Sequence, residues 1–337
     1  MALRLIELFL PEKPAGKVEH LLDEKQMLGI WREPLGDDRV LVRVLLRAED
    51  AEEAMDSFDK HFYTSEGFRM MLLPVEATLP RPEPREEPKE EMIENLPEEK
   101  PKPQRISREE LYADIEDSAK LSKVFVVMVL LSSIVAAIGL LHNNVTVVIG
   151  AMVIAPLLGP NVALSLATTL GDRELATRAL KTNAVGIIAG FSLALLMGLV
   201  FGARPDIPEI ASRTRVELVD IVLALASGCA GALAFTAGAP AAVIGVMVAV
   251  ALLPPLVVVG ILLGGGFAYS AVGALLLLLT NLICVNIAGV VTFLIQGIRP
   301  ITWWEEDRAK KATRISLITW LLLLSALVGV ILLSQRR

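Results

Sequence analysis

The amino-acid sequence predicts a polytopic α-helical membrane protein with a small α+β domain at its N-terminus. No Asp, Glu, Lys or Arg occurs from Val124 to Gly171, and none occurs from Ile221 to Ile298. A soluble fold alternates apolar cores with charged faces and loops, so it does not accommodate uncharged runs of this length. The chain as a whole is 54% hydrophobic with a mean hydropathy of +0.58. Apolar stretches of roughly 20 residues match the hydrocarbon thickness of a bilayer.

Residues 1–77 show short apolar runs that alternate with amphipathic segments. The predicted strands are Leu3–Leu10, Met27–Arg32, Arg39–Arg47 and Phe68–Val75, and the predicted helices are Lys17–Lys25 and Glu49–Phe62. The resulting order, β-α-β-β-α-β, predicts a ferredoxin-like domain over residues 1–77. This order indicates a shape and not a function.

Residues 78–106 have the composition of a linker. Seven prolines lie among Glu, Lys and Arg residues between Thr78 and Pro103, and such a composition does not form a core. A plain spacer is favoured over a recognition motif. The sequence Ser107-Arg-Glu-Glu110 then matches a capping box, which predicts a helix that runs through Lys123 into the first span.

The transmembrane domain is predicted over residues 107–337 with about seven spans. The predicted spans are Val124–Leu141, Val145–Leu170, Asn183–Phe201, Leu218–Ala237, Ala241–Leu263, Tyr269–Ile298 and Ile315–Ser334. With the N-terminus inside, ten basic residues of the loops and ends lie on the cytoplasmic side and five on the other. This excess favours a cytoplasmic N-terminal domain.

An internal repeat is the most informative feature of the membrane domain. The run Val148–Val153 recurs as Val243–Val248, at an offset of 95 residues. At that offset Leu157, Leu158 and Pro160 match Leu252, Leu253 and Pro255, and after a small slip Thr182-Asn183 resembles Thr280-Asn281. The repeat units are residues 124–201 and 218–298, with span 315–334 outside them. Three spans in each unit place the second unit upside down relative to the first, which is the inverted repeat common in transporters.

Prolines interrupt the middle span of both repeat units. The first unit carries Pro156, Gly159 and Pro160, and the second carries Pro254 and Pro255. Proline lacks an amide donor, so the freed carbonyls must face protein or a wet cavity rather than lipid. Two matched breaks predict a binding site between the units. The alternative is a pair of simple kinks that serve helix packing.

Polar side chains near these prolines complete the predicted site. The predicted substrate-binding residues are Pro156, Gly159, Pro160, Asn161, Asn183, Pro254, Pro255, Thr280 and Asn281. An amide in lipid needs a partner, so these Asn residues face the bundle interior. Whether they hold a ligand or only bond neighbouring helices stays open at this point. The uncharged spans argue against a carboxylate proton relay, and no catalytic residues, metal site or cofactor are predicted.

The proline-containing motifs resemble a known family. The residues are the run Val148–Pro160, the pair Gly171-Asp172 after it, and the run Ala249–Pro255. They resemble the domain-of-unknown-function 389 family, hydrophobic membrane proteins of bacteria and archaea. The resemblance covers about residues 120–298, and the N-terminal domain with its linker is similar to the longer-chain branch of that family. It implies a fold, but no activity and no functional residues.

We therefore expect a transporter or permease for an unidentified small solute or ion, not an enzyme. Its expected location is the inner (cytoplasmic) membrane, and its expected partners are the lipid bilayer, the solute or ion and further copies of itself, without nucleic acid. The N-terminal domain is expected to regulate the membrane domain or to mediate oligomerisation of the protein. Two alternatives remain: an ion channel, and a membrane sensor or scaffold whose soluble domain binds a metabolite or partner.

Overall fold

The computed structural model describes residues 3–22, 27–78, 106–239, 241–299 and 303–335, without the side chains of 241–251, 303–312 and 332–335. The predicted linker, residues 78–106, lies almost entirely outside this description. The chain forms two compact units, Met1–Glu110 and Leu111–Arg337. The boundary between them falls within helix α3, Arg108–Ser118.

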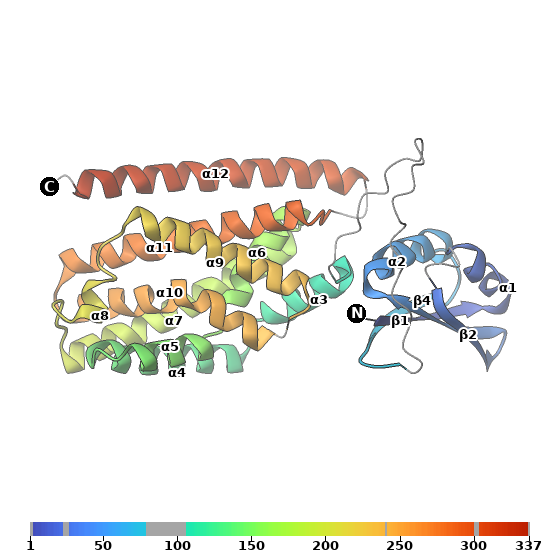
Figure 1. The fold of residues 1–337 in the computed structure, drawn as a ribbon, viewed down its shortest axis with the longest axis horizontal. Helices are drawn as coiled ribbons and strands as arrows, with labels where there is room; N and C mark the ends of the chain where they lie inside the picture. The colour runs from blue at the N-terminus through green and yellow to red at the C-terminus, as the bar shows by residue number, and fades with distance from the viewer. Residues whose placement is uncertain (1–2, 23–26, 79–105, 240, 300–302, 336–337) are drawn as a thin grey trace, which may run out of the picture. The chain divides into compact units, whose positions relative to one another are not determined.

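The N-terminal unit is built on a four-stranded antiparallel sheet. The strands are β1 (Leu3–Pro11), β2 (Met27–Gly36), β3 (Arg39–Arg47) and β4 (Arg69–Val75), in the order β2-β3-β1-β4. Helix α2, Ala48–Phe62, lies across one face of this sheet (Figure 1). Alternate residues of β1, such as Ile6 and Leu8, pack against Phe58 and Phe62 of the helix.

The first connection of this unit differs from the prediction. The expected helix Lys17–Lys25 is replaced by a short helix α1, Glu12–Ala15, and a 3-10 turn, Val18–His20, while residues 23–26 lie outside the description. The apolar spacing after Lys17 supports little more than one turn, and an isolated turn does not recover the cost of helix nucleation.

Helix α3 begins where the capping box predicted, but with a different partner for its acidic residue. The Ser107 hydroxyl accepts the Glu110 amide at 3.2 Å. The Glu110 carboxylate instead accepts two bonds of 2.8 Å from the Arg4 guanidinium. A buried cation requires a charged partner, and a two-bond pair between guanidinium and carboxylate is among the strongest hydrogen-bonded contacts in proteins. The motif therefore predicted the start of the helix correctly, but the Glu110 side chain pairs with Arg4 and does not cap the helix.

The prediction that this helix continues into the first span is wrong. Helix α3 ends at Ser118, and a new helix, α4, runs over Lys123–Leu141. The Ser122 hydroxyl accepts the Phe125 amide at 3.0 Å, which is the N-cap of a separate helix. The chain thus turns between residues 119 and 122 before the apolar run begins.

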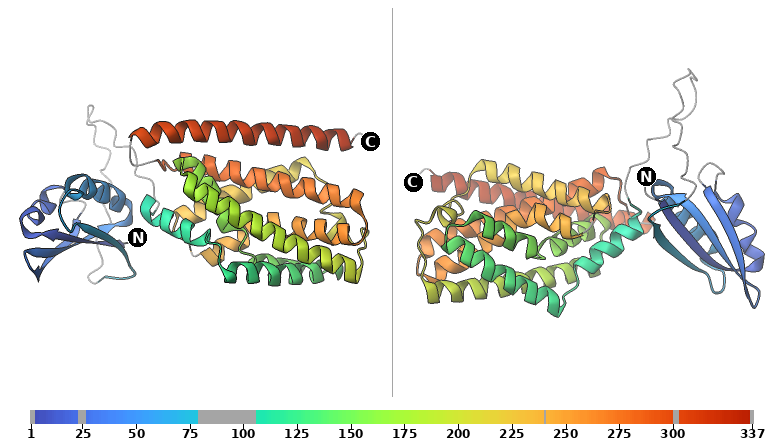
Figure 2. Two further views of the ribbon diagram at one scale, coloured as in Figure 1. Left: turned by 180° about the vertical axis from the view of Figure 1, so that it is seen from behind. Right: turned by 60° about the horizontal axis from the view of Figure 1, so that its bottom comes forward.

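The C-terminal compact unit, Leu111–Arg337, is a bundle of helices (Figure 2). After α4 they are α5 (Val145–Ile154), α6 (Leu158–Leu170), α7 (Arg173–Phe201), α8 (Pro208–Ala211), α9 (Leu218–Thr236), α10 (Ala241–Gly264), α11 (Ala268–Ile295) and α12 (Trp303–Gln335). By length and composition, five helices within the described residues are able to cross a membrane: α4, α7, α9, α11 and the Thr313–Ile331 part of α12. The bent pair α5 and α6 makes a sixth if it counts as one span, and α10 contributes the apolar segment Leu252–Gly264. Seven spans were predicted.

The two predicted repeat units pack against each other reciprocally. Helix α7 of the first unit packs on α10 of the second, and α11 of the second unit packs on α6 of the first. The contact of α7 with α10 is close because small residues form it: a Cβ on Gly260 would lie 2.5 Å from that of Ala194, and one on Gly198 would meet the Ile261 carbonyl. Helix α12 lies at the edge of the bundle (Figures 1 and 2).

The first predicted break is present and the second is not. Helices α5 and α6 meet at an angle of 53° across residues 155–157. Ala155 has φ −71° and ψ 119°, the extended conformation that a following proline, here Pro156, imposes. Helix α10, in contrast, runs without interruption through Pro254 and Pro255.

The repeat itself explains this difference. At the offset of 95, the counterpart of Pro156 is Ala251, so the second unit lacks the proline that ends α5. Pro160, the counterpart of Pro255, lies in the first turn of α6, where an amide has no intrahelical partner to lose. Of Pro156, Gly159 and Pro160, only Pro156 ends a helix, because the other two lie within the first turn of α6.

Candidate functional site

Polar side chains meet in the interior of the helical bundle, directly after the break between α5 and α6. We call Asn161 and Ser165 of α6, Asn183 of α7 and Asn286 of α11 the asparagine cluster. The solvent-exposed fractions of these four residues are 1%, 1%, 6% and 1% in that order. Asn161 is at its centre: its Nδ2 donates to Asn183 Oδ1 at 3.1 Å, and its Oδ1 accepts from Asn183 Nδ2 and Asn286 Nδ2, both at 3.3 Å. Three helices from both repeat units are therefore joined by one amide.

The bonds of Asn161 extend back to the break. Its Nδ2 also donates to the Leu157 carbonyl at 2.8 Å. This carbonyl lies at the N-cap of α6, one residue after Pro156. Asn161 therefore couples the helix break to α7 and α11.

The outer part of the cluster is also bonded. Asn286 Nδ2 donates to the Leu282 carbonyl at 2.8 Å, and the Ser165 hydroxyl lies 3.3 Å from Asn286 Oδ1. Bonded amides in an apolar interior avoid the cost of a few kcal/mol that an unpaired polar group incurs there.

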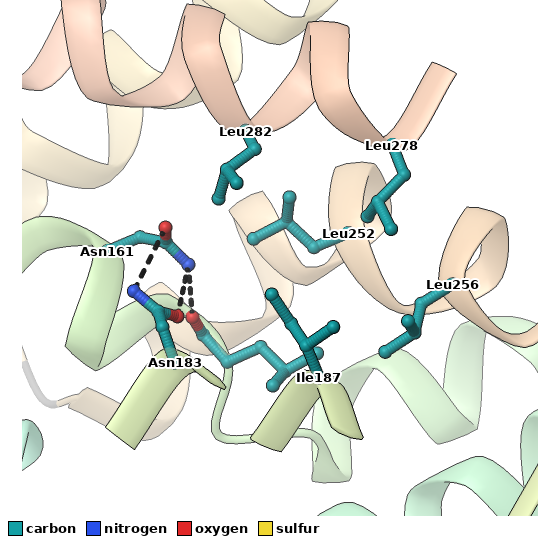
Figure 3. A pocket seen from close by; sticks show the side chains of 8 residues that line it. Asn161, Asn183, Ile187, Leu252, Leu256, Leu278 and Leu282 are labelled. Atoms are coloured by element: carbon teal, nitrogen blue, oxygen red, sulfur yellow. Dashed lines mark hydrogen bonds between the residues drawn. The ribbon is translucent and has the colours of Figure 1, made fainter. Parts of the chain in front are cut away.

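A small cavity opens beside two members of the cluster (Figure 3). Its lining residues are Leu157, Asn161, Asn183, Ile187, Leu252, Leu256, Leu278 and Leu282. It has room for about one water molecule. The two asparagine side chains lie on one side of the cavity, and the side chains of α10 and α11 that face them are leucines (Figure 3).

The segment before the first span packs on residues next to the cluster. The Thr182 hydroxyl donates to the Ala119 carbonyl at 2.8 Å. A Cβ on Gly159 would lie 2.5 Å from the Ser118 carbonyl, so only glycine admits this close approach without a shift. Thr182 precedes Asn183 directly, and Gly159 lies two positions before Asn161. The end of α3 therefore lies against this part of the bundle.

Tyr112 provides a further contact of α3 within this unit. Its hydroxyl donates to Asp172 Oδ2 at 2.7 Å. Burial raises the pKa of Tyr112, and the hydrogen bond to Asp172 raises it further. The hydroxyl therefore stays protonated and donates throughout the physiological pH range.

Of the nine residues predicted for the site, two line the cavity. Asn161 and Asn183 meet there, while Pro156 forms the break and Gly159 and Pro160 lie in the first turn of α6. The remaining four are buried but do not line the cavity: Pro254, Pro255, Thr280 and Asn281. The Thr280 hydroxyl has no hydrogen-bond partner among the described residues.

Sequence reasoning missed Asn286 and Ser165 as members of the cluster. Ser165 follows Asn161 by four residues and so lies on the same face of α6, which is a usable signal. Asn286 lies in an apolar span, where an amide is expected to face the bundle interior, but its bond to Asn161 was not predictable because the two residues are 125 positions apart in sequence. Among the described residues, no group of three His, Cys, Asp or Glu side chains suits a metal ion.

The uncharged helices and their buried polar cluster define a helical membrane protein. The family described as "Domain of unknown function (DUF389)" matches residues 152–287. The "Uncharacterized protein MJ0678" of Methanocaldococcus jannaschii is 34% identical over 333 residues, which cover 98% of this chain and 99% of that protein. The chain therefore belongs to the DUF389 family, as its proline-containing motifs indicated. No solved structure matches the chain.

Proposed function

We propose that the protein is a transporter or permease for a small solute or ion, with the cavity beside Asn161 and Asn183 as its substrate site. The observation that carries this proposal is a buried amide cluster that joins both repeat units next to a broken helix. Irregular backbone and polar side chains at membrane depth are typical of positions that line a solute path.

The position of the cavity within the repeat supports the proposal. Two pairs of its lining residues are counterparts at the offset of 95: Leu157 with Leu252, and Asn161 with Leu256. Equivalent residues of two related units approach each other near their symmetry axis, and an inverted repeat has its substrate site there. The reciprocal packing of α7 on α10 and of α11 on α6 supports such a repeat.

The remaining parts of the proposal concern the surroundings of the site. The protein is a multi-pass protein of the cytoplasmic membrane, with its N-terminal domain in the cytoplasm according to the distribution of basic residues. The strand order β2-β3-β1-β4 supports a ferredoxin-like domain. In this proposal that domain regulates the protein or mediates its oligomerisation. No enzymatic role is proposed, and a channel is the variant of this proposal in which the path opens to both sides at once.

Thiol accessibility tests the proposal without knowledge of the substrate. The variant Asn183→Cys, in a background with Cys229→Ala and Cys284→Ala, is reconstituted in vesicles and treated with a membrane-impermeant maleimide from either side. A solute path makes the new thiol react from at least one side at a measurable rate. Asp206→Cys, at an exposed loop position, is the positive control, and Val290→Cys, fully buried away from the cavity, is the negative control.

A membrane sensor or scaffold is the second candidate function. The small volume of the cavity favours it, because a closed bundle is all that a scaffold requires. In that case Asn183→Cys stays as unreactive as Val290→Cys from both sides while Asp206→Cys reacts. That result would replace the transporter by the scaffold.

A further inference from the structure

We infer that the molecule bound in this cavity is uncharged, of about the size of water, and able both to donate and to accept a hydrogen bond. The inference rests on the proposed function and names its substrate class. Three properties of the cavity carry it: the open bonding positions of Asn183, the composition of the lining, and the available space.

Asn183 is the member of the asparagine cluster with bonding capacity left. An asparagine amide offers two N–H donors and a carbonyl oxygen that accepts two bonds. Asn161 uses all of these, with two donated and two accepted bonds. Asn183 donates one and accepts one, both with Asn161, and has no further hydrogen-bond partner among the described residues.

The open positions of Asn183 adjoin the cavity. The side chain is 6% exposed and lines the cavity together with Asn161 (Figure 3). One N–H and one acceptor position of a buried amide thus remain for a molecule in that space. A ligand that uses both must itself be a donor and an acceptor, and two to four polar contacts are what a buried water needs.

The rest of the lining disfavours an ion. Six of the eight lining residues are leucine or isoleucine, and none is charged. Moving an ion from water into such surroundings incurs a large desolvation penalty. One free amide position does not offset that cost. The carbonyls of Met152 and Pro156, which lack their helical donors because residues 156 and 160 are prolines, belong to residues outside the lining.

A small neutral molecule meets no such barrier. It gives up its bonds to water and regains a donor and an acceptor from Asn183, and its small volume fits the space for about one water molecule. Urea has this chemistry but is larger than the space, whereas water and ammonia have both the chemistry and the size. Dehydrated Na⁺ and Cl⁻ do not.

Selective flux into proteoliposomes tests the inference. The full chain is reconstituted, and three neutral probes are followed by stopped-flow. Water flux is measured as vesicle shrinkage in a sucrose gradient, urea flux as vesicle swelling, and ammonia flux as internal alkalinisation. Entry of Na⁺ and Cl⁻ is followed with entrapped fluorescent indicators. We expect faster flux of water or ammonia than in protein-free vesicles, with no increase for urea or for either ion.

Two variants connect that flux to the cavity. Asn183→Leu removes the free donor and acceptor at similar volume, and Leu278→Phe fills the cavity while it leaves the cluster intact. Both are expected to abolish the protein-dependent neutral flux. Thr177→Val, on the same helix with a hydroxyl bonded only to its own helix at the Arg173 carbonyl, is expected to retain it. Size-exclusion profiles show which variants are folded, and Leu278→Phe alone suffices if Asn183→Leu is not.

The outcomes separate this inference from the proposed function. Flux of urea, Na⁺ or Cl⁻ without flux of water or ammonia overturns the substrate class and leaves a transporter. Neutral flux that both folded variants retain overturns the assignment to this cavity. The absence of flux for every probe, together with an unreactive Asn183→Cys, overturns the proposed function as well.

Discussion

The two proline-containing middle spans of the repeat share a sequence motif and differ in structure. In the first unit, Pro156 separates α5 from α6 at an angle of 53°, and Asn161 follows in the first turns of α6. In the second, α10 continues through Pro254 and Pro255, and Leu256 occupies the place of Asn161. One unit therefore provides the break and the central amide, and the other provides an apolar wall. The two occurrences of the motif therefore differ in structure because a few of their residues differ.

The largest expected effect belongs to Asn161→Leu, which gives the first unit the residue of the second. It removes four hydrogen bonds and leaves Asn183 without any partner among the described residues. Since each orphaned buried group costs about 1–3 kcal/mol, we expect a loss of about 2 kcal/mol or more in unfolding free energy, measured by denaturation in detergent. Leu256→Met, a volume-conserving change at the counterpart position, is expected to cost less than about 1.5 kcal/mol. Equal losses in the two variants would contradict a special role of the amide.

A second prediction concerns the glycine that stands where the second unit has Pro254. In Gly159→Ala the new Cβ meets the Ser118 carbonyl at 2.5 Å, so we expect a loss of about 1–3 kcal/mol from overpacking. Gly150→Ala is the matched control, because nothing lies within 4 Å of its Cβ and alanine favours the helix. Thermal unfolding of both variants measures the difference. A Gly159→Ala variant as stable as Gly150→Ala would show that the end of α3 does not pack there.

Pro156→Ala tests the origin of the difference between the two spans directly, since the second unit has Ala251 at this place. Without the restriction on Ala155, the segment becomes free to continue as helix. We expect the angle between α5 and α6 to fall below 53°, measured as a longer distance between spin labels at Val145 and Leu170 in a chain without native cysteines. An unchanged distance would mean that packing, rather than the proline, sets the bend.

The smallest effects are expected at the two threonines that the repeat aligns. Thr182→Val breaks the bond to the Ala119 carbonyl and should cost about 1 kcal/mol. Thr280 is fully buried and its hydroxyl has no hydrogen-bond partner among the described residues, so Thr280→Val should be neutral or stabilising. Chemical denaturation of the pair measures both. A larger loss in Thr280→Val would reveal a ligand or partner of that hydroxyl in the native protein.

Much of the fold was predictable because the relevant signals are local. The uncharged runs predicted apolar helices, the alternation in β3 predicted a strand, and Ser107 marked the start of α3. The prolines were a weaker signal. They predicted two breaks, and only Pro156 produces one, because the effect of a proline depends on its position relative to the first turn of a helix.

The candidate site was predictable in part for the same reason. Asn161 and Asn183 were expected to face the bundle interior, since amides avoid lipid, and both do so. Asn281 was expected beside them by analogy with Asn183, but it is Asn286 that bonds to Asn161. The five-residue difference between Asn281 and Asn286 rotates a side chain to another face of α11, and only the packing of α11 on α6 selects between them.

The sequence by itself determined that the chain contains apolar helices of membrane length, a proline-containing motif that occurs twice, and a separate small sheet domain. These follow from composition, periodicity and self-similarity, which are properties of neighbouring or aligned residues. Only the tertiary structure decided which prolines break a helix, which amides meet, and that Asn183 retains an open donor and acceptor beside a cavity. Hydrogen bonds and cavities depend on distances between residues remote in sequence, and no local pattern encodes those distances.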